Sequence, residues 1–212
     1  MLKNQLDALE KGFKYLSNKF YNNTLNEDNT IITIQSKGKT NSYGWCSCDK
    51  AWYDGKDYSP LEEQIPKYYE INISAEHLNR GFGNNMETLL HEMVHLDNIL
   101  HNINDCSSRQ FHNENFKKGA KRVGLNAHKV KQYGYAETSM TRGLIDDVHE
   151  FIVNSGIDVE IFNVSRIDKV IKKVTRTNKK IKMVCSGCGN IVSCDDEINI
   201  TCKDCGIEFI KK

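Results

Sequence analysis

Leu89-Leu90-His91-Glu92-Met93-Val94-His95-Leu96 is the most informative stretch of this 212-residue chain. On a helix, positions four apart have Cβ atoms about 5–6 Å apart, so the two histidines can bind one Zn²⁺ at roughly 2.0–2.1 Å. Glu92, next to the first histidine, can then reach a zinc-bound water as a general base. The pattern therefore predicts a catalytic metal site on a helix.

The residues around this motif are mostly apolar, which is typical of a buried active-site helix. The alternative is a helix that carries two histidines on one face by coincidence. Such a helix would not need apolar residues around the histidines. Asn84 and Asn85 can cap the helix, which we expect to run from about Met86 to Ile99. The apolar residues are Met86, Leu89, Leu90, Met93, Val94 and Leu96.

The flanking patterns predict an α+β domain. Apolar residues at spacings of three and four over 2–22 indicate an amphipathic helix, which Asn22-Asn23 ends. Strand-like segments come next and further helices follow the motif, an order that favours a small antiparallel or mixed sheet with a zincin-like HExxH helix. The strands are expected at 31–35, 43–46, 51–53 and 68–74, and the later helices at 108–122 and 141–154.

The composition favours an intracellular protein that uses cysteine for metal binding. The formal net charge is only +1, so the charge of the whole chain does not point to nucleic acid. Residues 1–7 lack the apolar core of a signal peptide and no run approaches membrane-spanning length, so we expect a cytoplasmic location and no membrane partner. Eight cysteines in a reducing compartment favour metal ligation over disulfides.

A catalytic zinc usually keeps three protein ligands, so one residue must join His91 and His95. His101 is one candidate, because it completes the metzincin spacing with Asn98 in place of the usual glycine. His112 is the other, at the start of the next expected helix, from which a side chain can face the motif helix. The spacing alone leaves both open.

Two motifs together resemble the SprT-like (Spartan-type) metalloprotease domain: His91-Glu92-Met93-Val94-His95 and, after a polar loop, His112-Asn113-Glu114-Asn115-Phe116. The resemblance covers roughly residues 5–125 and is strongest over 84–125. In that family a helix and a small sheet precede the motif helix, and the third histidine opens a later helix as His-x-x-x-Phe. A zinc ribbon often follows the protease domain.

The resemblance implies His91, His95 and His112 as ligands of a catalytic zinc, with Glu92 as the base. It also implies that the substrates are proteins attached to DNA. Glu114, as a carboxylate ligand of the gluzincin type, is a further alternative for the third position.

The tail carries two CxxC pairs, Cys185/Cys188 and Cys202/Cys205, separated by 13 residues. This separation matches a Cys₄ structural zinc, with Gly189 and Gly206 permitting a tight turn after each pair. A fragment this short cannot build a sufficient core, so the metal should supply much of its folding energy. We do not expect Cys194, or the closely spaced Cys46 and Cys48, to be ligands.

A basic segment precedes this tail. Residues 166–182 contain eight lysines and arginines against one acid, Asp168. The segment could contact DNA phosphates, or it could be the solvated face of an amphipathic helix. The predicted nucleic-acid contacts are Lys172, Lys173, Arg176, Lys179 and Lys180.

The sequence therefore predicts a metalloprotease domain over 1–160, a basic linker or helix over 161–183, and a Cys₄ zinc ribbon over 184–212. It predicts one catalytic and one structural Zn²⁺, and a metallopeptidase in which Glu92 activates the zinc-bound water. The alternatives are a non-catalytic nucleic-acid-binding zinc protein and a narrow-specificity regulatory protease of metzincin type with His101 as third ligand.

Two expectations concern the substrate. The segment Tyr68–Ser74 is expected to be an edge strand that pairs with an extended peptide backbone. Tyr133 or Tyr135 could donate a hydrogen bond to the oxyanion, although tyrosines in such a region are more often packing residues.

Overall fold

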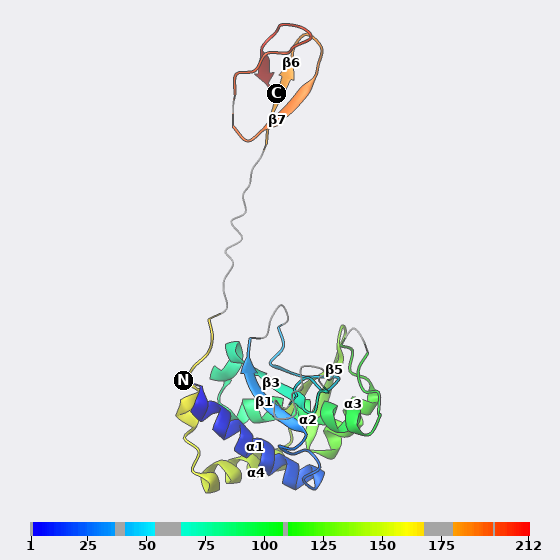
Figure 1. The fold of residues 1–212 in the computed structure, drawn as a ribbon, viewed down its shortest axis with the longest axis vertical. Coiled ribbons are helices and arrows are strands. Elements are labelled where there is room, and N and C mark those ends of the chain that lie inside the picture. The colour runs from blue at the N-terminus through cyan, green and yellow to red at the C-terminus, as the bar shows by residue number, and fades with distance from the viewer. Residues whose placement is uncertain (1, 37–40, 54–64, 108–109, 168–179, 197) are drawn as a thin grey trace. The chain divides into compact units, whose positions relative to one another are not determined.

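The computed structural model describes residues 2–36, 41–53, 65–107, 110–167, 180–196 and 198–212. Contacts within the chain divide it into two compact units, Met1–Asp168 and Lys169–Lys212, called here unit 1 and unit 2 (Figure 1). Both contain small sheets, and the fold is mixed α+β. The boundaries near residues 160 and 183, predicted to separate the metalloprotease domain, the basic linker and the zinc ribbon, stay predictions.

Unit 1 begins with helix α1 (Lys3–Tyr21), which packs on a three-stranded sheet made of β1 (Thr30–Gln35), β2 (Gly44–Cys46) and β3 (Tyr69–Ser74). The strand order is β1-β3-β2, with β1 parallel and β2 antiparallel to β3. The expectation that Tyr68–Ser74 is an edge strand is therefore wrong. The alternation of residues along this segment shows that its two faces differ, and it does not show whether the strand lies at the edge or in the centre of the sheet.

Helix α2 (Phe82–Leu100) carries the HExxH motif and begins four residues earlier than predicted. Gly81, at φ 86°, stands at its N-cap position after the 3₁₀ helix η2 (Ala75–Arg80). Asn84 and Asn85 are therefore not caps: they lie inside the helix, and the Asn85 amide donates to the carbonyls of Leu78 and Gly81. These bonds join α2 to the segment that precedes it.

Helix α3 (Glu114–Arg122) is shorter than the predicted 108–122, because Asn113 caps it and accepts from the N–H groups of Asn115 and Phe116. After α3 comes an antiparallel hairpin of β4 (Leu125–Val130) and β5 (Gly134–Met140), which the sequence analysis did not predict. Few of its residues are strongly apolar, so the hairpin gives a weak strand signal. It is held by pairing and by packing on α2 and α3.

Helix α4 (Arg142–Ser155), expected at 141–154, is capped by Thr141 and ended by Gly156 in the left-handed conformation. It lies beside α1, where Tyr15 stacks on Phe151 with ring centroids 4.4 Å apart. The short 3₁₀ helix η3 (Val159–Phe162) completes unit 1. The main core runs between α1, α2 and one face of the sheet, with Leu9, Phe13, Ile71, Ile73, Met86, Leu89, Leu90 and Met93 fully or almost fully buried.

Unit 2 is an antiparallel sheet of β6 (Ile181–Cys185), β7 (Ile191–Cys194) and β8 (Phe209–Lys211) in the order β7-β6-β8. Its two CxxC turns have the same construction. The N–H of Gly189 donates to Cys185 and that of Gly206 to Cys202, both at 2.8 Å. Both glycines have positive φ, 74° and 66°, as the predicted tight turns require.

No helix in the described part of the chain combines the length and the apolar character needed to cross a membrane.

Candidate metal centres

Three histidine side chains of unit 1 converge on one point. His91 and His95 lie one turn apart on α2, and His112 immediately precedes the cap of α3. The Nε2 atom of His112 lies 3.2 Å from Nε2 of His91 and 3.0 Å from Nε2 of His95. All three candidate ligand atoms lie within 4.8 Å of one another.

The backbone of His112 is held on both sides by isolated bridges. It pairs with Cys106 in the loop after α2 and with Gly134 at the start of β5. Its N–H donates to the carbonyl of Tyr133, and its carbonyl accepts from the N–H of Tyr135. A Cβ at Gly134 would lie 2.1 Å from the His112 carbonyl oxygen, so this close approach requires glycine. The hairpin therefore fixes the position of the third histidine.

Each imidazole uses its other ring nitrogen for a different oxygen atom. Nδ1 of His95 lies 2.9 Å from the carboxylate of Asp105, and Nδ1 of His112 lies 3.0 Å from the carbonyl of Gln110. Nδ1 of His91 lies 3.4 Å from the hydroxyl of Thr138. When these oxygens accept, the ring protons sit on Nδ1, and all three Nε2 atoms present lone pairs to one another.

This donor set fits a metal ion. Two Nε2 atoms bound tetrahedrally at about 2.05 Å from one zinc lie about 3.3 Å apart, close to the separations found here. Burial lowers the pKa of His112 to about 4 and, with the neighbouring histidines, holds the pKa of His91 well below its ordinary value. Both shifts favour the neutral imidazole, which is the form that binds metals.

Phe116 forms an apolar wall against the three histidines. Its ring centroid lies 4.6 Å from that of His91, of His95 and of His112, and its side chain is fully buried. Phe116 is in the first turn of α3, four residues after His112. The His-x-x-x-Phe motif thus corresponds to two rings in contact, one from the loop and one from the helix.

Glu92 lies beside the histidines on the side of β2. It is buried, and burial raises the pKa of its carboxyl to about 7, with His95 opposing the shift and Asp105 adding to it. A Cβ at Gly44 would meet the Asn72 carbonyl oxygen at 2.7 Å and Oε1 of Glu92 at 3.3 Å. Gly44 thus lets β2 approach the carboxylate closely.

The backbone of β2 offers hydrogen-bonding groups on its outer side. Tyr43 accepts from Ser74, and Ser47 donates to Glu70, so these alternate residues face β3. Gly44 and Cys46, between them, therefore point their N–H and C=O groups away from β3. Among the described residues, no strand pairs with β2 on that side.

The structure keeps the other two proposed third ligands away from this centre. His101 is 61% exposed and its Nδ1 bonds the Asp97 carbonyl at 2.8 Å. Helix α2 continues past Asn98, whose amide donates to Asp105 at 2.8 Å, so the chain does not turn out of the helix there as a metzincin requires. Glu114 is on the surface, bonded to Tyr135 and Lys117.

Of the two tyrosines considered as oxyanion donors, Tyr135 donates its hydroxyl to Glu114 at 2.5 Å. Lys117 lies over its ring at 4.5 Å from the centroid. Tyr135 therefore takes part in a surface packing arrangement. Tyr133 is 43% exposed and lies next to the backbone of His112, so its role stays a prediction.

Unit 2 holds a second candidate centre, in which Cys185, Cys188, Cys202 and Cys205 bring their sulfur atoms within 4.8 Å of one another. The N–H group of Cys188 is the main reason why the pKa of Cys185 falls to about 7. This bond favours the thiolate of Cys185, the metal-binding form, whereas hydrogen bonds among the thiols raise the pKa of Cys188 and Cys205. The sulfur of Cys194 instead faces the carbonyl of Ile181 at 3.6 Å.

The remaining cysteines belong to neither group. Cys46 ends β2, Cys48 is exposed, and Cys106 forms the bridge to His112. Among the predicted nucleic-acid contacts, Lys180 is described and exposed, whereas Lys172, Lys173, Arg176 and Lys179 lie outside the described residues.

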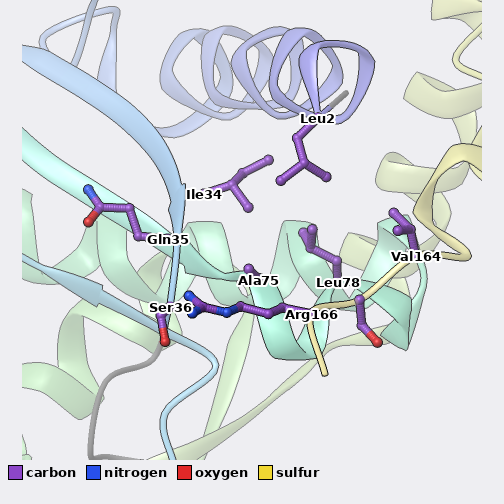
Figure 2. A pocket seen from close by; sticks show the side chains of 9 residues that line it. Leu2, Ile34, Gln35, Ser36, Ala75, Leu78, Val164 and Arg166 are labelled. Atoms are coloured by element: carbon purple, nitrogen blue, oxygen red, sulfur yellow. The ribbon is translucent and has the colours of Figure 1, made fainter. Parts of the chain in front are cut away.

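A pocket of about 340 Å³ lies away from the histidines, between the start of α1, the end of β1, η2 and the segment 164–166 (Figure 2). Its walls are mostly apolar, and Arg166 extends along one side. None of the residues that line it belongs to either candidate metal group. We therefore assign it no part in the chemistry.

Sequence reasoning missed Asp105, Thr138 and Glu87, which surround the histidines. No local motif marks these residues. Asp105 lies in a loop, Thr138 in a hairpin and Glu87 one helix turn before His91, and only the fold brings them close to the histidines. Only Phe116 had a signal, in the spacing that follows His112.

These observations define unit 1 as an α+β domain with a candidate metal-binding group of three histidines, two on α2 and one just before α3. The family model described as the SprT-like family matches residues 9–139, and the chain belongs to this family. The resemblance inferred from the two histidine motifs is thus confirmed. Searches among curated proteins and among solved structures found no match.

Proposed function

We propose that the chain is a zinc metallopeptidase of the HExxH type, with His91, His95 and His112 as ligands and Glu92 as general base. The observation that carries this proposal is the convergence of three histidine side chains next to a buried carboxyl group. Membership of the SprT-like family, to which metallopeptidase activity is generally ascribed, supports it.

Bound zinc would supply a Lewis acid that polarises the scissile carbonyl and makes the attacking water more acidic. Glu92 would take a proton from that water on a carboxylate oxygen and pass it to the departing amide nitrogen. Its raised pKa, about 7, suits both steps, because a group that accepts and then donates works best near the ambient pH. Asp105 and the Gln110 carbonyl would keep the His95 and His112 rings in place.

The substrate would lie along β2, not along β3. Gly44 and Cys46 point their backbone groups outward next to Glu92, so an extended peptide could pair with them and bring its carbonyl to the centre. Backbone pairing gives weak side-chain selectivity, which suits an enzyme that cleaves unfolded protein. We retain Tyr133 as the candidate oxyanion donor.

The test is hydrolysis of unfolded casein by the zinc-loaded full chain and by Glu92→Gln, with zinc content measured in both. We expect Glu92→Gln to keep its zinc and lose activity by about 10²–10⁴-fold. Glu114→Gln is the matched control and should keep full activity. A zinc-loaded Glu92→Gln variant as active as wild type would refute the mechanism.

Zinc stoichiometry tests the ligand set. His112→Ala should lose one zinc of two, whereas His101→Ala should keep both. Loss in His101→Ala alone would favour the metzincin alternative. If a single zinc is bound and removing the tail abolishes it, the non-catalytic zinc protein becomes the better account.

We further propose that the substrates are proteins bound to DNA. Family membership supports this, as does the basic segment 166–182, whose lysines and arginines can neutralise phosphates. Binding of a single-stranded oligonucleotide should weaken steeply with salt and disappear when residues 166–212 are deleted. Oligonucleotide binding that survives the deletion would show that this segment is not the DNA-binding site. If the full chain does not bind the oligonucleotide at all, a regulatory protease is favoured.

A further inference from the structure

The hydroxyl of Thr138 lies between a histidine and a carboxylate. Its Oγ1 atom is 3.4 Å from Nδ1 of His91 and 3.2 Å from Oε1 of Glu87. A hydroxyl has one proton to donate and lone pairs with which to accept. The carboxylate can only accept, so Thr138 donates to Glu87 and presents a lone pair to His91.

This polarity determines which nitrogen of His91 carries the proton. Nδ1–H donates to Thr138, and Nε2 keeps its lone pair facing Nε2 of His112, 3.2 Å away. If the hydroxyl rotated and donated to His91, the proton would move to Nε2 and occupy the position a metal would take. Glu87 prevents this rotation because it takes the hydroxyl proton.

Two elements place these residues. Glu87 lies on α2 one turn before His91, so both side chains are on the same face of the helix. Thr138 lies on β5, opposite Ala127 in the hairpin register. Burial raises the pKa of the Glu87 carboxyl, and hydrogen bonds from the Thr138 hydroxyl and the Met140 N–H, with the charges of Arg80 and His128, oppose that shift. Two donors of the hairpin, the Thr138 hydroxyl and the Met140 N–H, therefore face this carboxyl.

We propose that Thr138 and Glu87 are positioning residues for the metal centre, with Glu87 acting on His91 through the Thr138 hydroxyl. The proposal rests on the histidine zinc site of the proposed function. It gives the hairpin a second role besides holding His112. It also means that His91 and His95 are oriented differently: His95 bonds a carboxylate directly, and His91 bonds a hydroxyl backed by a carboxylate.

The first test measures zinc affinity of the full chain by competition with a chelator. Thr138→Val keeps the side-chain shape and removes the acceptor, so we expect zinc at the histidine centre to bind about 10-fold more weakly. Thr138→Ser should restore the affinity. Ser139→Ala is the matched control, because it removes the hydroxyl next to Thr138 along β5, which bonds the exposed His128 at 2.9 Å. This variant should keep the wild-type zinc affinity. Binding at the four cysteines serves as the internal reference in every variant.

The second test asks whether Glu87 acts through Thr138. Glu87→Ala alone should weaken zinc binding, and it should have no further effect in a Thr138→Val background. Independent, additive losses would overturn the relay, because they would show that Glu87 acts by another route. Wild-type affinity in Thr138→Val, or failure of Thr138→Ser to restore it, would overturn the role of the hydroxyl.

The outcomes separate this inference from the proposed function. A wild-type chain that binds zinc at the histidines but does not cleave casein refutes the peptidase and leaves the positioning roles to be decided by the variants. A wild-type chain that binds no zinc there refutes both.

Discussion

The two candidate metal centres differ in how they are built. In unit 2 the four cysteines come from two turns of the same construction. Apart from Cys185 and Cys202 themselves, Met183 is the only buried side chain among the described residues of this unit. In unit 1 two histidines come from a helix, and the third comes from a loop whose backbone is bonded to a hairpin. All of the main core cluster lies in this unit. The comparison indicates that the metal should hold unit 2 together, whereas the core of unit 1 should hold its centre in place without metal.

The largest expected effect comes from removing zinc. A strong chelator should unfold unit 2, because structural zinc supplies about 10–16 kcal/mol in small zinc modules. Unit 1 should keep its fold. Amide NMR spectra of the full chain would show signals of residues 180–212 collapse while those of 2–166 persist. Collapse of both sets, or of neither, would contradict the comparison, and Cys185→Ser should reproduce the effect on unit 2 alone.

The core of unit 1 can be weakened at the centre itself. Phe116→Ala removes a buried ring that touches all three histidines, so we expect a loss of about 3–5 kcal/mol in the free energy of unfolding of unit 1. Zinc at the histidines should bind more weakly and zinc at the cysteines should not change. Urea unfolding and chelator competition measure the two effects. Phe116→Leu, which fills most of the space, should have a clearly smaller effect on both.

A matched pair of glycines compares the two centres directly. In Gly44→Ala the new Cβ meets backbone at 2.7 Å and Thr88 Cγ2 at 2.8 Å, so we expect unit 1 to lose about 1–3 kcal/mol. Casein hydrolysis should fall as β2 moves away from Glu92. In Gly187→Ala the new Cβ meets Ile207 Cδ1 at 2.9 Å and the Cys205 sulfur at 3.2 Å.

Gly187→Ala should therefore weaken zinc at the cysteines alone, because the flexible end of Ile207 can shift but the ligand side chain cannot. Thermal unfolding, zinc affinity and hydrolysis of both variants measure this. A loss of hydrolysis in Gly187→Ala equal to that in Gly44→Ala would show that the two centres are coupled.

The smallest effect concerns thiol reactivity in the zinc-loaded chain. Burial raises the pKa of Cys106 to about 11 and that of Cys46 well above its ordinary value. The thiolate is the reactive form, so both should react slowly with iodoacetamide near pH 7. The rate at Cys106 should rise as the pH approaches 11. Exposed Cys48 is the reference. Mass spectrometry after timed labelling would contradict this if Cys106 reacted as fast as Cys48 at pH 7.

Local patterns were enough to predict the parts of each centre that lie close together in the chain. The spacing of His91 and His95 follows from the helix period, and the paired cysteines follow from two short turns. The helices α1 and α4 were expected nearly at their observed bounds because their apolar spacing and end residues are local signals. The SprT-like family was also evident from two short motifs.

Only the tertiary structure showed that His112, and not His101, lies close to His91 and His95, because this depends on where α2 ends and how the loop after it returns. It also placed Tyr68–Ser74 between β1 and β2, which are the edge strands of this sheet among the described residues, since an alternating strand carries no information about its neighbours. Asp105 and Thr138 reach the histidines through a loop and a hairpin with no sequence signature. Contacts between residues far apart in the chain are set by packing and strand register, which a local pattern does not encode.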